Sequence, residues 1–251
     1  MRDGKALQMS TSHELGQNFA RAFNIVYQSE AGQSELCHTT SWGASTRLVG
    51  GLIMAHGDDR GLVVPPRLAP IQVVIIAVRD ESAVLDACAT IDAALRASGI
   101  ATSIDRGRGS FGRRVTDWEI KGIPLRVEVG PRDLASGVVT VVRRDDGSKR
   151  VVAIDELASQ AKELLEEMQL ALLDDARARR DAATADVTSV DEAIEAAQTG
   201  FARIAWDLVG EAGEARLNDL AVSVRCIQRA DGSTPDRPDE ADLVAIVAKA
   251  Y

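Results

Sequence analysis

The sequence has few cysteines, few aromatic residues and no long apolar run. Aromatic residues make up 4% of the 251 residues, and the three cysteines, Cys37, Cys88 and Cys226, are far apart. An odd number of separated cysteines forms neither a disulfide framework nor a paired zinc motif. No apolar run approaches the roughly 20 residues of a membrane-spanning helix, and the first residues, MRDGKALQ, lack the apolar core of a signal peptide. We therefore expect a cytoplasmic protein with no membrane partner.

The chain also lacks the positive charge of a protein that coats nucleic acid. Its 29 Lys and Arg residues against 38 Asp and Glu residues give a net charge of −9. The cations are nevertheless concentrated, because residues 106–114, RGRGSFGRR, contain four arginines and no acid. Such a segment on an acidic protein favours a specific anionic partner, although each arginine alone is equally explained as a solvated loop residue.

The hydrophobic pattern predicts an α/β module in the middle of the chain. Residues 71–78 form a near-continuous apolar run, which is typical of a strand buried on both faces. Residues 82–97 have the period of an amphipathic helix that ends at Gly99. Alternation of strands and helices then favours a covered sheet. Strands are expected at 100–104, 125–129, 138–143 and 149–154, and helices at 113–121 and 155–182.

The flanking parts have weaker patterns, and Pro70 marks a boundary. Before it we expect a helix at 12–22, an extended segment at 36–42, a helix from Ser45 and a short strand at 62–66. After the long helix we expect an α+β unit with a helix at 190–197, strands at 203–208, 222–227 and 243–248, and a polar loop at 230–240. The expected domains are 1–69, 70–175 and 176–251.

Several blocks occur in an order that resembles one family. They are ALQMSTSHELGQNF at 6–19, TTSWGASTR at 39–47, MAHGDDRGLVVPPRLAP at 54–70, WEIKGIPLRVEVGPRD at 118–133 and VRRD at 142–145. Together they resemble the prolyl-tRNA synthetases of the eukaryote/archaeal-like type, over essentially the whole chain. The resemblance implies the C-terminal part of an antiparallel class II catalytic domain, an α/β anticodon-binding domain with a mixed five-stranded sheet, and a small α+β C-terminal domain.

In that family TTSWGASTR would be motif 3, which binds ATP. The resemblance implies that Arg47 holds the γ-phosphate and that Ser45 contacts the nucleotide. An arginine in the first turn of a helix suits a polyphosphate. Gln8 and Thr11 would also face ATP, with Gln8 near Mg²⁺.

The proline pocket would be lined by His13, with Trp42 and Gly43 close by. A glycine allows the backbone to approach a flat ligand closely. Taken alone, a histidine such as His13 is more often a helix-capping residue than a ligand, and a tryptophan such as Trp42 is more often a core residue than part of a pocket. The family usually has glycine where Ser10 stands, so we expect the added Cβ to crowd the ligand.

The resemblance places the contacts to the anticodon guanines at Glu119, Arg126 and Arg132. A carboxylate can accept from guanine N1–H and N2–H, and an arginine can donate to O6 and N7. The alternative is that Glu119 simply pairs with Arg126 or Lys121. The arginines of residues 106–114 would contact phosphates of the partner, tRNA(Pro).

The last part of the chain resembles a C-terminal domain that often carries a four-cysteine zinc site. Val209 stands where one cysteine is expected, and Cys226 is the single cysteine of this part. One thiol cannot hold structural zinc, so we expect none. The carboxylate of Tyr251 would reach toward the active site, as it does in the family.

The sequence contains no block that resembles class II motif 1 or motif 2. Motif 1 builds the dimer interface of the homodimeric full-length members, and motif 2 supplies a second arginine to ATP. We therefore expect a C-terminal fragment of a proline–tRNA ligase, which uses ATP, Mg²⁺, L-proline and tRNA(Pro), and expect it to be inactive alone. A non-catalytic tRNA-binding module derived from the synthetase and a decayed fragment are the alternatives.

Overall fold

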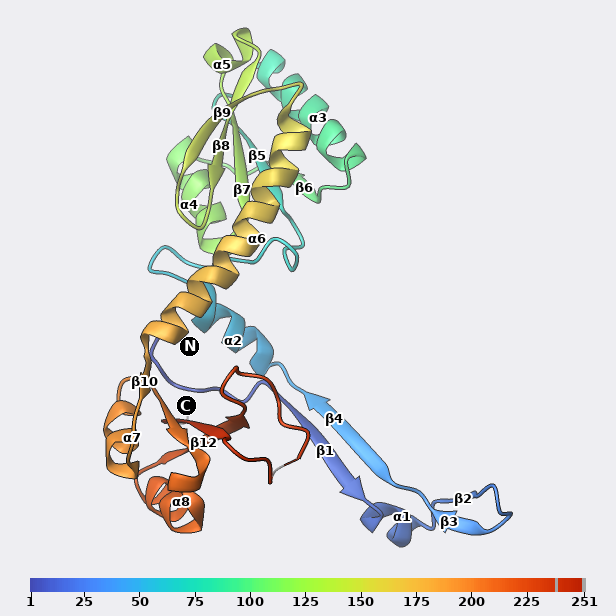
Figure 1. The fold of residues 1–251 in the computed structure, drawn as a ribbon. Coiled ribbons are helices and arrows are strands. Elements are labelled where there is room, and N and C mark those ends of the chain that lie inside the picture. Colours follow the sequence, from blue (N-terminus) through green and yellow to red (C-terminus); the bar gives the residue numbers. More distant parts are fainter. Residues whose placement is uncertain (238, 250–251) are drawn as a thin grey trace. The chain divides into compact units, whose positions relative to one another are not determined.

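A computed structural model describes residues 1–237 and 239–249 (Figure 1). The chain divides into two compact units. One contains residues 3–51 together with the described residues from 186 onward, and the other contains residues 52–185. The three domains expected from the sequence stay a prediction. None of the described helices is both long and apolar enough to cross a membrane.

The second unit is built on the mixed five-stranded sheet that the resemblance implies, with strand order β6-β5-β7-β8-β9. Its parallel strands are β5 (Val73–Ala77), β6 (Thr102–Ile104) and β7 (Leu125–Val129). The antiparallel strands are β8 (Val138–Arg143) and β9 (Lys149–Ala153). These strands and α3 (Ser82–Ala97) confirm the predicted module, with shifts of one to two residues at some strand ends.

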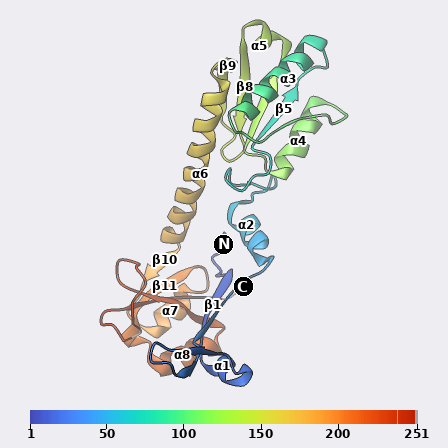
Figure 2. The ribbon, with the colours of Figure 1, turned by 90° about the vertical axis from the view of Figure 1, so that its right-hand side faces the viewer.

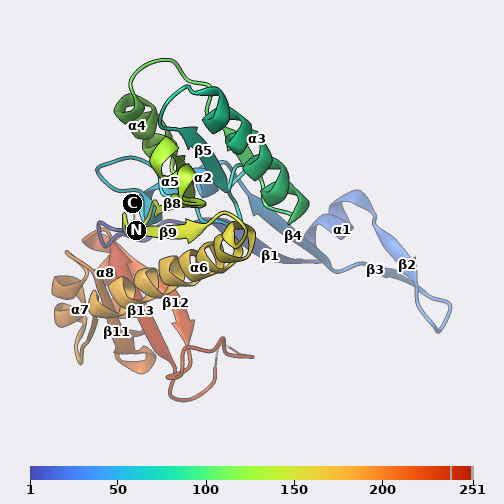
Figure 3. The ribbon, with the colours of Figure 1, turned by 90° about the horizontal axis from the view of Figure 1, so that it is seen from above.

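Helices cover both faces of this sheet, which explains why every residue of β5 is buried. Val73, Ile75 and Ala77 share one core with α3 and with the first turns of α6 (Leu157–Ala182). Val74 faces the other side, toward α4 (Phe111–Lys121), and Figure 3 shows β5 between α3 and α4. Figure 2 shows α6 running on beyond the end of β9, where Met168 and Leu172 pack on Val63.

Residues 62–66 do not form the predicted strand. Leu62 N donates to Ile120 O (3.0 Å) and Val64 N donates to Gly122 O (3.1 Å), so the segment pairs with the C-terminal turn of α4. Gly122 has φ +72°, and a Cβ there would lie 2.5 Å from the carbonyl of Leu62. A helix end offers too few partners to extend a strand, and Pro65 and Pro66 have no N–H. A short helix that the sequence did not predict, α5 (Pro131–Ala135), follows β7.

The N-terminal part of the first unit is a two-stranded antiparallel sheet of β1 (Ser10–Gly16) and β4 (Thr39–Ala44). Figure 1 shows the two strands side by side, with α1 (Asn18–Phe23) and the β2–β3 hairpin at their far end. The hairpin strands are Val26–Gln28 and Ser34–Leu36. The helix predicted at 12–22 is therefore wrong over 12–16, because pairing with β4 satisfies that backbone. The helix predicted from Ser45 is confirmed as α2 (Arg47–His56).

The C-terminal part of this unit contains the four-stranded sheet β10-β11-β13-β12. The predicted strand at 203–208 ends early, because β11 stops at Ala205 and residues 206–208 form a 3-10 turn. The predicted polar loop at 230–240 has no helix or strand among its described residues. The elements are β10 (Thr184–Asp186), α7 (Val190–Ala196), β11 (Phe201–Ala205), η1 (Trp206–Leu208), α8 (Gly210–Asp219), β12 (Val222–Gln228) and β13 (Val244–Lys249), of which β10 and α8 were not predicted.

Candidate functional site

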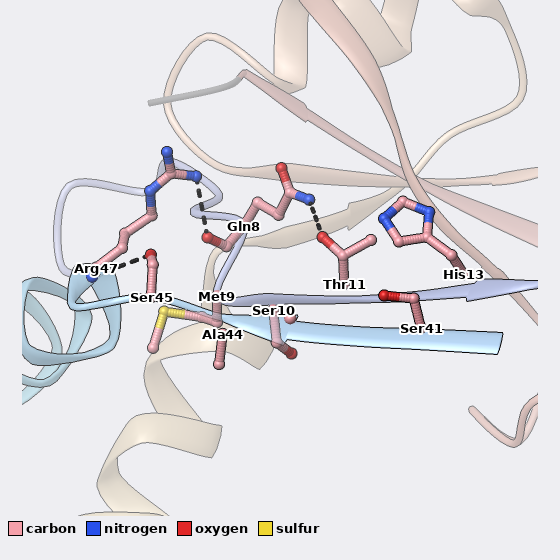
Figure 4. A pocket seen from close by; sticks show the side chains of 10 residues that line it. Gln8, Met9, Ser10, Thr11, His13, Ser41, Ala44, Ser45 and Arg47 are labelled. Carbon is pink, nitrogen blue, oxygen red and sulfur yellow. Dashed lines mark hydrogen bonds between the residues drawn. The ribbon is translucent and has the colours of Figure 1, made fainter.

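A pocket lies where β1 and β4 meet the start of α2, and Figure 4 shows the side chains that line it. Two segments far apart in sequence supply the lining, because β1 and β4 pair and α2 follows β4 directly. The predicted ATP and proline residues that line it are Gln8, Thr11, His13, Gly43, Ser45 and Arg47. The structure therefore brings these predicted residues together at one surface.

Arg47 is the cation of this pocket. Its Nη1 donates to Gln8 O (3.3 Å) and its backbone N donates to Ser45 Oγ (3.3 Å). Gln8 Nε2 in turn donates to Thr11 Oγ1 (2.7 Å). The pocket lining contains no carboxylate, and within the described part of the chain no acid forms an ion pair with Arg47. The guanidinium therefore keeps donors available for an anion.

Trp42 is the exception among the predicted pocket residues. Thr11 pairs with Gly43 and His13 with Ser41, whereas Trp42 pairs with Ser12 in the intervening register position. Because side chains alternate across a strand, Trp42 lies on the opposite face of the sheet, and it is 76% exposed. The prediction that it lies beside the proline ligand is corrected accordingly.

The side chain of Ser10 points away from the face that carries the predicted ligand residues. Figure 4 shows its side chain on the side of the strands opposite Thr11, His13 and Ser41. The position that is usually glycine in the family is therefore filled by a Cβ that points away from Thr11 and His13. Ser10 is nevertheless among the residues that line the pocket, so crowding of a ligand by its Cβ stays a prediction.

The residues present do not form a metal site by themselves. Mg²⁺ is usually held by one or two carboxylates together with substrate phosphates, and Gln8 and Thr11 offer only neutral oxygens. Among residues 1–237 and 239–249 no three His, Cys, Asp or Glu side chains are grouped to hold a metal ion. The residues present do not fit a four-cysteine zinc site either, since Val209 is buried in an apolar core and Cys226 has no cysteine partner among the described residues. Tyr251 lies outside the described residues.

Hydrogen bonds from Arg229 close the loop between β12 and β13. Arg229 Nε donates to Glu240 Oε2 (2.8 Å) and Nη2 donates to Asp236 Oδ2 (2.9 Å). Its Nη1 donates to Thr234 O (2.6 Å). Glu240 Oε1 also accepts from the backbone N of Asp236 (2.6 Å) and Arg237 (3.0 Å). One guanidinium thus joins both arms of the connection between β12 and β13.

A second pocket lies on the α4 face of the five-stranded sheet and contains two of the predicted anticodon residues. Its lining is Val74, Trp118, Glu119, Ile123, Arg126, Val142 and Arg144. Arg126 Nη1 lies 3.8 Å from Glu119 Oε1, and Arg126 Nε donates to Glu128 Oε1 (2.8 Å). The side chains of Arg126 and Glu119 are 11% and 27% exposed. The pairing that the sequence left as an alternative is therefore present.

Arg132 is not part of this pocket. It is exposed on α5, which follows the carboxyl end of β7, whereas Arg126 is near the start of that strand. The strand rises about 10 Å from Arg126 to its last residue, Val129, and Arg132 lies beyond that end. The structure brings Glu119 and Arg126 together and places Arg132 beyond the carboxyl end of β7.

Sequence reasoning missed the residue that supports this pocket, Arg144. Its side chain is 2% exposed and donates to both oxygens of Asp58, at 2.6 and 2.9 Å. Its Nε donates to Glu119 O (3.0 Å). These hydrogen bonds hold the pKa of Asp58 well below its usual range. Both residues stand in blocks that carry the family resemblance, but a pairing across 86 positions leaves no periodic signal.

The chain is similar in sequence to a family model and to curated proteins. The anticodon binding domain model matches residues 72–164. A proline–tRNA ligase from Frankia alni is 58% identical over the whole chain, and one from Streptomyces avermitilis is 53% identical. The chain belongs to the prolyl-tRNA synthetase family. It spans about half the length of these curated relatives, 54% in both cases.

Crystal structures of the prolyl-tRNA synthetase from Cryptosporidium parvum are similar in fold. One, complexed with halofuginone and AMPPNP, has a TM-score of 0.88 and 34% identity, and covers 99% of this chain and 54% of that protein. Another, complexed with L-proline and AMP, has a TM-score of 0.87 and 33% identity over the same shares. Because bacterial relatives match as well, the eukaryote/archaeal-like type stays a prediction.

Proposed function

We propose that this chain is the part of a proline–tRNA ligase that contains the tRNA-reading domain and one wall of the aminoacylation site. The observation that carries the proposal is Arg47, which faces the same pocket as Gln8, Thr11 and Ser45 and has no carboxylate partner among the described residues. The ligands of the Cryptosporidium parvum relative, AMPPNP in one structure and L-proline with AMP in the other, support a nucleotide and an imino acid here.

The proposed reaction needs alignment and charge neutralisation more than proton transfer. The proline carboxylate attacks the α-phosphorus of ATP, pyrophosphate leaves, and the prolyl group then passes to the terminal ribose of tRNA(Pro). Arg47 would bind the γ-phosphate and so stabilise the charge that leaves with pyrophosphate. Gln8, Thr11 and Ser45 would hold the nucleotide, and His13 and Gly43 would line the proline side.

The tRNA-reading half of the proposal rests on the pocket of Glu119 and Arg126. Reading a guanine requires that their ion pair opens and that both groups turn to the base. A full-length synthetase of this family would form a homodimer. The proposed tRNA-reading pocket does not depend on a second protomer, because all its lining residues lie within residues 52–185.

The test measures the binding of tRNA(Pro) to the full chain by fluorescence anisotropy. We expect tighter binding of tRNA(Pro) than of the same transcript with its anticodon guanines replaced. Arg126→Ala should weaken tRNA(Pro) binding by about 5- to 150-fold, the equivalent of roughly 1–3 kcal/mol for one base contact. The same substitution should weaken the binding of the altered transcript much less. An equal loss for both transcripts would refute base reading by Arg126, and equal affinities with the unmodified chain would refute the proposed function.

A further inference from the structure

The arginine-rich segment after β6 contains two kinds of arginine. Arg114 is a structural residue: its side chain is 8% exposed, Nη1 donates to Asp105 Oδ2 (2.8 Å), and Nη2 donates to Ala77 O (2.6 Å). Arg106, Arg108 and Arg113 are exposed, and in the described part of the chain no carboxylate forms an ion pair with any of them. We call these three exposed residues the arginine patch.

The patch is held in place by a buried carboxylate. Asp105 accepts from Gly107 N (3.2 Å) within the loop, and from Arg114 and Trp118 Nε1 (2.9 Å) on α4. Its side chain is almost fully buried. The loop is therefore tied to α4 at two points, and the arginines extend from a fixed backbone.

The same helix carries the base-reading pocket. Trp118, which binds Asp105, lines that pocket beside Glu119. The eleven residues of α4 span about 16 Å from its first turn, which carries Arg113, to its last turn. A single nucleic acid strand running along α4 can therefore reach both places.

The chemistry of the patch favours phosphate. Three neighbouring cations without counter-charges repel one another, and an anionic ligand removes that cost. A guanidinium forms paired hydrogen bonds with phosphate oxygens. Gly112 has no neighbouring atom within 4 Å of an added Cβ, so a bulky ligand can approach the backbone there. Because α4 also carries Glu119, which lies beside Arg126 in the pocket proposed to read a base, RNA explains the surface better than an acidic protein does.

We propose that Arg106, Arg108 and Arg113 bind the sugar-phosphate backbone of the tRNA whose bases the Glu119–Arg126 pocket reads, and that they do so without regard to base sequence. The inference rests on the proposed function and adds to it a contact surface for the phosphates. Arg114 is a positioning residue that fixes the loop through Asp105.

The test measures the affinity of the full chain for tRNA(Pro) as a function of salt concentration. Each phosphate contact contributes about 0.7–0.9 to the slope of log K against log salt. The triple variant Arg106→Ala, Arg108→Ala, Arg113→Ala should lower that slope by about 2–3. It should leave the preference for tRNA(Pro) over the anticodon-altered transcript unchanged. The thermal midpoint checks that the variant is folded.

The matched control removes three exposed arginines elsewhere in the same unit, Arg67→Ala, Arg177→Ala and Arg180→Ala. It should keep the slope of the unmodified chain. An equal fall in the control would show a bulk charge effect and overturn the inference. So would an unchanged slope in the patch variant, or competition by polyglutamate as strong as that by RNA. If the unmodified chain prefers tRNA(Pro) while the patch variant keeps its slope, the proposed function survives and this inference fails.

Discussion

The pair of Arg144 and Asp58 connects the turn after α2 to the pocket that Glu119 and Arg126 line. The guanidinium is buried and donates to both carboxylate oxygens and to Glu119 O. Removing one partner of such a pair leaves the other with an uncompensated desolvation cost. Since Asp58 is partly exposed, water recovers some of that cost.

We predict that Arg144→Met lowers the free energy of unfolding by about 2–3 kcal/mol near pH 7. The pKa of Asp58 is lowered by the hydrogen bonds from Arg144, so the stabilisation is fully present above the unfolded pKa, about 4. The difference between the two proteins should therefore begin to shrink as the pH falls below about 4. Urea unfolding at several pH values measures it.

The control for this prediction is Arg150→Met. Arg150 pairs with Glu167 at 3.1 Å, and both side chains are nearly half exposed. An exposed pair contributes about 0–1 kcal/mol, so the change should be small and nearly independent of pH over this range. A loss as large as that of Arg144→Met would contradict the role assigned to burial.

At the scale of elements, Arg229 holds the loop between β12 and β13 together through hydrogen bonds to Glu240 and Asp236. We predict that Arg229→Ala accelerates hydrogen exchange at the backbone amide of Asp236, which donates to Glu240 Oε1. The reason is that Glu240 loses the guanidinium that orients it. Exchange in β11, outside the loop, should not change.

Arg237→Ala is the matched control in the same loop, because the Arg237 side chain forms a long, exposed ion pair with Asp239 (3.9 Å). It should leave exchange at Asp236 close to that of the unmodified chain. A chelator should leave exchange in both the unmodified and the control protein unchanged. Acceleration by the chelator would contradict closure by Arg229.

For the whole molecule, the exposure of the Arg47 pocket to water bears on whether the chain alone can activate proline. Most of β1 and β4 is accessible to water, and a cation in water stabilises developing charge weakly. We predict no proline-dependent ATP–pyrophosphate exchange above background for the purified chain, with the full-length Frankia alni relative as the positive control. Exchange within tenfold of that relative would contradict the prediction.

Local periodicity was sufficient for much of the second unit. The helix at 82–97 is confirmed at both ends, because Val84, Cys88, Ile91 and Leu95 recur at helical spacing and pack on one core. Residues 12–16 show the opposite case, since their helical spacing is overridden by pairing with β4. A periodic pattern reports only which side chains can share a face, so it fails where a distant strand supplies the backbone partners.

The order of the sequence blocks was enough to group the residues of the candidate pocket. It did not predict which face of the β1–β4 sheet each side chain occupies. Gln8, Thr11 and Arg47 were grouped by resemblance and do line one pocket. Trp42 belongs to the same block as Arg47, yet the register of β1 with β4 places it on the other face. Register depends on the pairing of two strands and is not encoded in either strand alone.

By itself the sequence determined the family and the alternation of the α/β module, because these depend on residue identity and local spacing. Only the tertiary structure decided which arginines are free and which are paired. Arg106 and Arg114 are alike in the sequence, but one is exposed and the other is buried on Asp105. The reason is physical: a guanidinium becomes structural or available according to the carboxylates and carbonyls that folding brings near it, and these come from distant segments.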